Sequence, residues 1–338
     1  MEVGGAGPRR PLAVITDDRF GESAIEQAIL GAAGVELVVA KCRSSAEVAA
    51  AGREADALLV NLAPADAAAI EALERCRVIA RYGIGLDNVD QEAARRRGIR
   101  VANVPGYCDT EVAEHALALI LALSRGIARR DRVVRGGGWG GTPFGRRIAG
   151  TTLGILGFGG TGQALARIAL ALSFREILVW SPHISAGRIA EALGPAPAAL
   201  GAVVRPAGFE ELLSRSDWVS VHLPLKGETR GIVGASAMAM MKKEACLVNV
   251  SRGAVLDEEA LIDAMATGAL AGVGLDVFVA EPLPQGNRLR SFPNAVFTDH
   301  NAYASTESIA ELRRRTAENA LAGLAAAGLV PSGPGLPR

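Results

Sequence analysis

Five side chains in the second half of the chain could bind an anion or exchange a proton. Arg252, Asp276, His222 and His300 lie at or just beyond the ends of short apolar stretches, and Glu281 lies in the loop beyond Asp276. Ligands of open α/β sheets bind beyond the carboxyl ends of the strands, so these side chains converge if the stretches are parallel strands. A guanidinium binds a carboxylate as a fork, and an imidazole changes its charge near neutral pH.

A glycine-rich turn lies upstream of these residues, in the stretch LGILGFGGTGQALARIALAL. It places Gly157, Gly159 and Gly162 in a GxGxxG pattern between an apolar strand and a helix. The first glycine permits the tight turn, the second lets a pyrophosphate approach the backbone, and the third lets the helix lie close to the strand. The helix start offers unpaired N–H groups to the phosphates. In this context the pattern predicts dinucleotide binding rather than a merely structural turn.

Apolar runs that alternate with Ala-rich, charge-dotted stretches must supply the elements that position these residues. The first series of predicted strands covers 12–17, 35–40, 57–62, 78–83 and 100–105, and the second covers 151–157, 176–181, 203–206, 218–223, 245–251, 271–278 and 294–298. Strands that are apolar throughout, with helices between them, indicate parallel sheets covered on both faces. The predicted fold class is therefore α/β, with two doubly wound parallel-sheet domains and a hinged cleft between them.

Three other segments complete this outline. One long helix is expected from about Thr110 to Arg135, with a glycine-rich loop over 135–145 that ends it. The segment 194–208 is loop-like with a short strand in its middle. Helical spacing returns from Ala304 to about Leu329, so a terminal helix could pack on the first domain.

Bulk properties exclude several classes of function. The 338 residues suit about two domains, and the 36 basic residues balance the 36 acidic ones, so no overall field favours nucleic acid or an anionic membrane. The longest apolar run, 116–123, is far shorter than a membrane span, and the first residues lack the order of a signal peptide. The four scattered cysteines fit neither a disulfide framework nor a metal site. We therefore expect a cytoplasmic protein without nucleic-acid or membrane partners and without a structural metal.

A family resemblance joins these observations. The chain resembles the D-isomer-specific 2-hydroxyacid dehydrogenases almost from end to end, in the branch of phosphoglycerate dehydrogenase, glyoxylate reductase and the C-terminal-binding proteins. The stretches that carry the resemblance are ARYGIGLDNVDQEAARRRGIRVANVPG, EVAEHALALILALSR, GTTLGILGFGGTGQALA, SDWVSVHLPLKGETRGIV, CLVNVSRGAVLDEEAL, GVGLDVFVAEPL and TDHNAYAS.

The resemblance implies roles for three residues. Arg252 would hold the carboxylate and the reacting oxygen of the substrate, His300 would be the acid/base, and Glu281 would be the partner of His300. Physical chemistry supports this division, because a hydride leaves a carbinol carbon only as the hydroxyl proton is removed by a base within hydrogen-bond reach. A carboxylate beside that base favours the imidazolium form, and a guanidinium stabilises developing oxyanion charge.

The resemblance also implies the binding residues. The substrate carboxylate would meet the backbone of Tyr82, Gly83, Ile84 and Gly85, although a plain turn after a strand would look the same in the sequence. The cofactor would lie against Gly157, Phe158, Gly159, Gly160, Thr161, Gly162, Ser181, His183, His222, Pro224, Thr229, Val250, Ser251, Asp276 and Thr110. Asp276 would contact the nicotinamide carboxamide, whereas His222 could equally have a structural role.

The chain departs from the family pattern at Ser181. NAD-specific members carry an acidic residue there, which bonds the ribose hydroxyls and repels a 2′-phosphate. NADP-preferring members usually place an arginine next, and here that position is Pro182, with His183 and Arg188 the nearby bases. The cofactor is therefore NAD or NADP, and we expect weak selectivity between them.

A second departure is Asp299, which precedes His300 where the family usually has proline. Its carboxylate could raise the pKa of the histidine or point outward, and the outward orientation is slightly favoured.

The sequence thus favours an oxidoreductase that transfers a hydride between nicotinamide and a small anionic 2-hydroxy or 2-keto acid. A phosphorylated or phosphonate-bearing substrate, or a hydrated aldehyde, would also meet the requirement. The alternative is a cofactor-sensing scaffold that resembles the C-terminal-binding corepressors. These proteins share the fold and also carry the residues that correspond to Arg252, Glu281 and His300.

The resemblance finally implies the domain plan. A flavodoxin-like substrate domain would comprise residues 1–107 and 304–338, and a Rossmann domain would comprise residues 108–303. The 110–135 helix region would supply much of a homodimer interface, although an ordinary core helix would read the same way.

Overall fold

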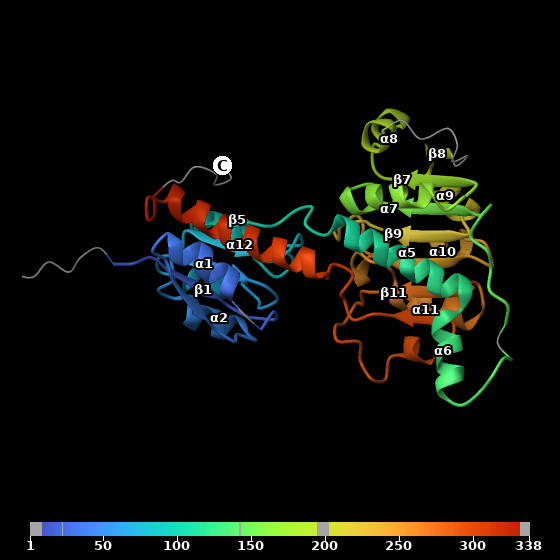
Figure 1. Cartoon of the computed structure of the whole chain (residues 1–338), viewed down its shortest axis with the longest axis horizontal. Coiled ribbons are helices and arrows are strands. Elements are labelled where there is room, and N and C mark those ends of the chain that lie inside the picture. Colours follow the sequence, from blue (N-terminus) through green and yellow to red (C-terminus); the bar gives the residue numbers. More distant parts are fainter. Residues whose placement is uncertain (1–8, 22, 142, 195–202, 332–338) are drawn as a thin grey trace, which may run out of the picture. The chain divides into compact units, whose positions relative to one another are not determined.

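The computed structural model describes residues 9–331, apart from 22, 142 and 195–202. The chain divides into two compact units (Figure 1). The first unit contains the chain up to Tyr107 and again from Ser305, and the second unit runs from Cys108 to Ala304. Each unit is an α/β structure built on one parallel sheet, as the apolar strands predicted.

The first unit holds a five-stranded sheet in the order β2-β1-β3-β4-β5, a flavodoxin-like arrangement. Its strands are β1 (Leu12–Ile15), β2 (Glu36–Val39), β3 (Ala57–Val60), β4 (Val78–Arg81) and β5 (Arg100–Ala102). Its helices are α1 (Ala24–Ala32), α2 (Ser45–Gly52), α3 (Ala67–Glu71), α4 (Gln91–Arg96) and α12 (Thr306–Ala326). Successive residues of the central strands enter two separate apolar clusters, one with α1 and α12 and one with α2, α3 and α4. The terminal helix thus packs on the first sheet, as its spacing suggested.

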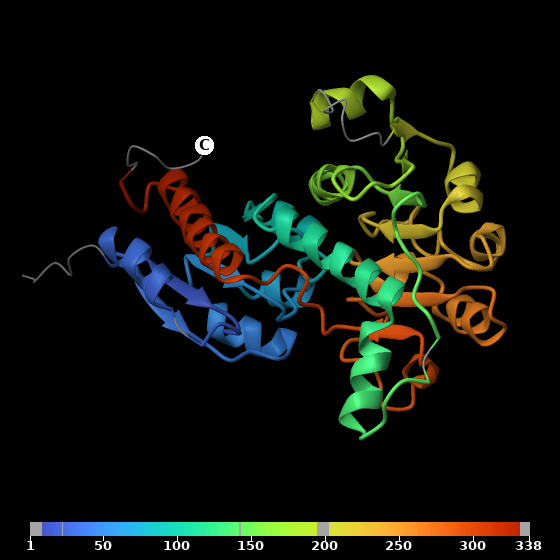
Figure 2. The ribbon, with the colours of Figure 1, turned by 45° about the vertical axis from the view of Figure 1, so that its right-hand side comes forward.

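The second unit holds a seven-stranded sheet in the order β12-β11-β10-β9-β6-β7-β8, a Rossmann arrangement with one further strand (Figure 2). Its strands are β6 (Thr152–Leu156), β7 (Glu176–Trp180), β8 (Val203–Pro206), β9 (Trp218–Val221), β10 (Cys246–Asn249), β11 (Gly272–Leu275) and β12 (Ala295–Phe297). Its helices are α5 (Asp109–Arg125), α6 (Ile127–Arg135), α7 (Gly160–Leu170), α8 (Ala186–Leu193), α9 (Phe209–Arg215), α10 (Ala235–Met240) and α11 (Glu258–Ala266), with the short 3₁₀ turns η2 (Gly253–Val255) and η3 (Arg288–Ser291).

One predicted element is wrong. The expected single helix over 110–135 is two helices, because Gly126 ends α5 in the left-handed conformation (φ 61°) and α6 starts in a new direction. The predicted strands are all present, each within three residues of its expected limits. The short strand inside the 194–208 segment is β8, and the part of that segment over 195–202 lies outside the described residues.

No helix among the described residues is long and apolar enough to cross a bilayer. All four cysteines are buried free thiols.

Candidate active site

The sequence-predicted residues of the second unit lie at one edge of its sheet. Because all seven strands are parallel, their carboxyl ends share that edge. Neighbouring strands β12, β11 and β10 end just before His300, Asp276 and Arg252. The glycine turn follows β6, at the point where the strand order reverses and ligands of such sheets bind. Strand spacing of about 4.8 Å places the ends of β12 and β10 roughly 10 Å apart.

The glycine turn has room for a pyrophosphate. Gly157 has a φ of 101°, and a side chain there would lie 2.5 Å from the carbonyl oxygen of His222. Gly159 precedes the first turn of α7, and a side chain there would meet nothing within 4 Å. The backbone is therefore closely packed against the residue after β9 at Gly157 and open at Gly159, which precedes the first N–H groups of α7. Phe158, Gly160, Thr161 and Gly162 complete this turn and the start of α7. These features fit a bound dinucleotide.

His222 fastens this turn to the neighbouring strand. Its ring nitrogens lie 2.8 Å from the Ser220 hydroxyl and 3.1 Å from the Thr161 hydroxyl. Burial disfavours the imidazolium and lowers the pKa of His222 to about 4. The residue is therefore a neutral link between β9 and the glycine turn, which gives it a structural contact whatever it does toward a cofactor.

This buried histidine makes stability depend on pH. Between the ordinary pKa of 6.5 and the folded value of about 4, the unfolded chain takes up a proton that the folded chain excludes. The contribution of His222 is therefore complete above pH 6.5 and falls by about 3 kcal/mol as the pH approaches 4. We expect His222→Asn to show a smaller loss of unfolding free energy between pH 7 and 4.5 than the parent, measured by urea denaturation. Equal losses in both proteins would contradict this assignment.

Arg252 is positioned by its neighbours on the β10 edge. The fully buried Asn249 donates from Nδ2 to the Arg252 carbonyl at 2.9 Å. Its Oδ1 accepts both the N–H and the hydroxyl of Ser251, at 3.0 and 2.9 Å. Ser251 and the buried Val250 are thus held by the strand end itself. Asn249 was not singled out in the sequence, although an amide at the end of an apolar strand is the signal that could have found it.

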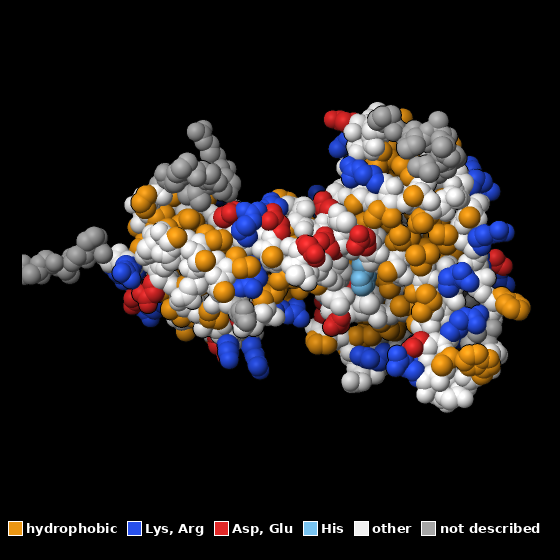
Figure 3. Space-filling view, in the orientation of Figure 1, with side chains coloured by type: hydrophobic (Ala, Val, Ile, Leu, Met, Phe, Trp, Pro, Cys, Tyr) orange, Lys and Arg blue, Asp and Glu red, His pale blue; other side chains and the backbone are white. Residues whose placement is uncertain are grey.

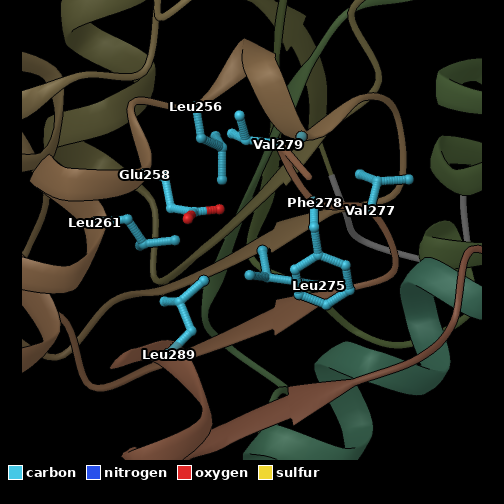
Figure 4. Close-up of a pocket in the computed structure, with 9 residues that line it drawn as sticks. Leu256, Glu258, Leu261, Leu275, Val277, Phe278, Val279 and Leu289 are labelled. Carbon is cyan, nitrogen blue, oxygen red and sulfur yellow. The ribbon is translucent and has the colours of Figure 1, made fainter. Parts of the chain in front are cut away.

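The loops that carry Arg252 and Glu281 lie next to each other, because the backbone after Arg252 packs closely against the backbone before Glu281. A side chain at Gly253 would overlap the Phe278 carbonyl group, so the turn after Arg252 lies directly against the segment before Glu281. Figure 4 shows the apolar side chains around this contact, with Leu275 and Phe278 on one side and Leu261 and Leu289 on the other. This apolar packing holds both loop segments against the carboxyl edge of the sheet.

Glu281 and His300 form a direct pair. Glu281 Oε2 lies 2.6 Å from His300 Nδ1, and Oε1 accepts the Phe278 N–H at 2.9 Å. Partial burial opposes ionisation of Glu281, but the two hydrogen bonds and the nearby Arg252 charge outweigh it and lower the pKa of the carboxyl. With Nδ1 directed at a carboxylate, Nε2 is the ring atom left to exchange a proton with a ligand. Asp299 is exposed, in agreement with the favoured outward orientation.

Asp276 is almost fully buried at the end of β11, and both of its carboxylate oxygens accept hydrogen bonds from the segment that carries His300. A contact between Asp276 and a nicotinamide carboxamide stays a prediction.

Most of the remaining cofactor-side residues lie in loops, and Thr110 lies at the start of a helix. Ser181 follows β7 in a turn closed by the Ile184 N–H, and His183 in that turn is exposed with a φ of 62°. Thr229 is buried, and its hydroxyl donates to the Pro224 carbonyl at 2.6 Å, so this pair stabilises its own loop. Thr110 is exposed in the first turn of α5.

The candidate substrate loop belongs to the first unit, where it follows β4. Tyr82 is buried, and its hydroxyl donates to Glu26 at 2.9 Å. Arg313 of α12 pairs with the same carboxylate at 2.7 Å, so three distant parts of the chain fix the start of the loop. Burial and the Glu26 charge raise the pKa of Tyr82 above its usual range. Beyond it, Gly83 accepts the Val104 N–H, and Ile84 is exposed before Gly85.

A glycine turn of the dinucleotide-binding pattern, a carboxylate–histidine pair and an arginine at one sheet edge are the features expected of a nicotinamide-dependent dehydrogenase. Residues 117–302 match the profile of the NAD binding domain of D-isomer specific 2-hydroxyacid dehydrogenases. The chain therefore belongs to the D-isomer specific 2-hydroxyacid dehydrogenase family and is an oxidoreductase of that class.

Curated relatives and solved structures agree with this assignment. The chain is 38% identical to a glyoxylate reductase of Korarchaeum cryptofilum over 276 residues, which are 80% of each protein. It is 39% identical over 261 residues to a D-3-phosphoglycerate dehydrogenase of Mycobacterium leprae, with 77% of this chain and 47% of that protein covered. A crystal structure of a glyoxylate reductase from Paecilomyes thermophila superposes with a TM-score of 0.82 at 28% identity and covers 96% of this chain and 98% of that one.

Proposed function

We propose that the protein interconverts a small anionic 2-hydroxy acid and the corresponding 2-keto acid, with Arg252, His300 and Glu281 as the reacting machinery. The observation that carries the proposal is the 2.6 Å Glu281–His300 pair at the same sheet edge as Arg252 and the glycine turn. Two of the relatives are named for glyoxylate and 3-phosphoglycerate, so phosphorylated and phosphonate-bearing acids or hydrated aldehydes belong in the candidate class.

The chemistry divides between the cofactor and the side chains. A bound nicotinamide supplies the hydride acceptor or donor. In the oxidative direction His300 Nε2 removes the hydroxyl proton as the carbonyl forms, and in the reductive direction it returns that proton. Glu281 orients the ring and stabilises its charged form. Arg252 binds the substrate carboxylate and the oxygen that gains negative charge. The backbone of Tyr82–Gly85 is the substrate-binding segment that we propose in the first unit.

We propose further that the two units are the functional domains, with residues 1–107 and 304–338 as the substrate domain and 108–303 as the dinucleotide domain. Within the latter, Ser181 carries no charge to repel a 2′-phosphate, and the exposed His183 and Arg188 are nearby on the chain. We therefore expect weak selectivity between NAD and NADP, and a preference for NAD beyond about a thousandfold in kcat/KM, roughly 4 kcal/mol, would contradict it.

We also propose a cytoplasmic setting, because four buried free thiols suit a reducing compartment.

Two glycine variants separate folding from cofactor binding. Gly159→Ala adds a methyl group where the protein leaves open space, so we expect an unchanged melting temperature and an NADH affinity at least about tenfold weaker. Gly157→Ala adds the same group at a positive φ and against the His222 carbonyl, so we expect the stability itself to fall by several kcal/mol. Thermal denaturation and NADH titration measure the two effects. Unchanged NADH affinity in Gly159→Ala would show that the pyrophosphate lies elsewhere.

The experiment that tests the function is a turnover screen read by nicotinamide absorbance. Glyoxylate, other 2-keto acids, phosphorylated hydroxy acids and anionic aldehydes are each tested with both cofactors. Turnover of at least one 2-keto or 2-hydroxy acid supports the proposal. Tight NADH binding with no turnover across the screen would instead support the cofactor-sensing scaffold.

We also propose a homodimer formed through α5, α6 and the loop that follows. No residue of α6 is buried, and Ile127, Val134, Trp139 and Phe144 are the exposed large apolar residues of this region, with Phe144 fully exposed. Figure 3 shows hydrophobic side chains gathered on the face of the second unit that carries α5. An exposed apolar surface of this kind supports the proposed interface. Sedimentation should give twice the monomer mass for the parent and the monomer mass for Phe144→Asp; a monomeric parent would refute the dimer.

A further inference from the structure

The turn that carries His300 is attached to a single buried carboxylate. The Asn301 N–H donates to Asp276 Oδ1 and the Ala302 N–H to Oδ2, each at 3.0 Å. The His300 N–H donates to the Asp276 carbonyl at 2.8 Å. Three successive amides of this turn are therefore held by one residue at the end of β11.

These hydrogen bonds hold His300 in a backbone conformation that is unfavourable for a non-glycine residue. His300 has a φ of 55°, in the left-handed region that non-glycine residues rarely adopt. Such a conformation persists only where the surroundings fix it, and it directs the histidine ring to Glu281 here. If the Asp276 carboxylate were held less firmly, the turn could therefore adopt a more favourable backbone conformation, and the His300 ring would move away from Glu281.

Asp276 is in turn fixed from helix α5. The Thr298 hydroxyl donates its proton to Asp276 Oδ1 at 2.6 Å. His115 Nε2 lies 2.9 Å from the same hydroxyl oxygen and 3.5 Å from Asp276 Oδ1. Because the hydroxyl proton is already committed to the carboxylate, the hydroxyl oxygen accepts the N–H of His115, which assigns the ring proton to Nε2. The half-buried His115 thus completes a chain of contacts from α5 through β12 to β11.

We propose that His115 is a positioning residue for the acid/base histidine and acts through Thr298 and Asp276. It touches no reacting group; it fixes the hydroxyl that helps to hold the Asp276 carboxylate, and the carboxylate fixes the His300 turn. This inference deepens the proposed function and rests on it for the role of His300. It predicts a defect in the rate of the chemical step rather than in ligand binding.

The test compares His115→Ala with His115→Gln, whose side-chain amide can replace the Nε2–H donor. In His115→Ala we expect the amides of Asn301 and Ala302 to exchange with solvent about tenfold faster. We expect kcat to fall about 10- to 100-fold. KM for the keto acid, the NADH affinity and the melting temperature should stay nearly unchanged. The Gln variant should recover most of both effects, and Thr298→Val should reproduce the Ala variant.

Unchanged amide exchange or unchanged kcat in His115→Ala would overturn the inference. A lower melting temperature with normal kcat per folded molecule would also overturn it, because that pattern marks a purely structural residue. The exchange measurement needs no substrate. If the parent turns over none of the acids, the proposed function fails, while the exchange data still decide whether His115 holds the His300 turn.

Discussion

Replacing Arg252 with alanine is expected to lower kcat/KM by about a thousandfold or more, equivalent to at least about 4 kcal/mol of transition-state stabilisation. In the proposed mechanism this change removes both the fork that holds the substrate carboxylate and the positive charge beside the reacting oxygen. NADH affinity should change by less than about threefold, because the proposed dinucleotide site is the glycine turn after β6, whereas the guanidinium belongs to the β10 edge. Steady-state kinetics and NADH titration measure the two quantities.

Two matched variants sharpen this result. Arg252→Lys keeps the charge but loses the fork, so its kcat/KM should lie between those of the parent and Arg252→Ala. Arg288→Ala removes an exposed guanidinium that pairs with the surface carboxylates of Glu259 and Asp263, at 3.7 and 3.8 Å, and should leave activity unchanged. If Arg252→Ala kept more than a tenth of the parental kcat/KM, this residue would not be the main substrate-binding group.

His300→Gln should lower kcat by about 100- to 10,000-fold, because glutamine can form a hydrogen bond but cannot take up the substrate proton. NADH should bind nearly as before, and the melting temperature should hardly change because the histidine side chain is 38% exposed. A variant with kcat within about fivefold of the parent would require another acid/base group.

Glu281→Gln tests the partner of the histidine. The amide keeps a group beside His300 Nδ1 but loses the negative charge that favours the imidazolium, so we expect a loss of about 10- to 100-fold. Asp299→Asn is the matched control, since it removes an exposed carboxylate next to His300 in sequence and should have little effect. Equal losses in these two variants would mean that general electrostatics, not the Glu281–His300 contact, drives the effect.

Periodicity alone predicted much of the fold. Strands such as β3 and β9 are buried on both faces, so they must be continuous apolar runs, and such runs are legible in a single sequence. Gly126 was a weaker signal. Nothing in its neighbourhood distinguished a glycine inside a helix from one that ends it, and its left-handed φ depends on where α6 packs.

The candidate site could be predicted from the sequence where it depends on the residue types that follow the strands. Gly157, Arg252 and His300 follow three strands whose parallel order puts their ends on one edge, so their types and positions indicated a dinucleotide site and an acid/base group. The residues that position these side chains could not be singled out in the sequence. Asn249 looks like an ordinary member of a strand end, although its partners Ser251 and Arg252 are close in the chain. His115 looks like an ordinary helix residue, and its partner Thr298 lies far away in the sequence.

The sequence by itself thus determined the class of fold and the family, and it singled out the candidate glycine turn and the candidate reacting residues, because these depend on short local patterns. The tertiary structure alone decided which side chains support them. His115 and Thr298 are 183 residues apart in the chain, and Glu26 and Arg313 are 287 apart. Contacts over such separations exist only once the sheets have formed, because strand order and helix packing, rather than local propensity, bring those side chains together.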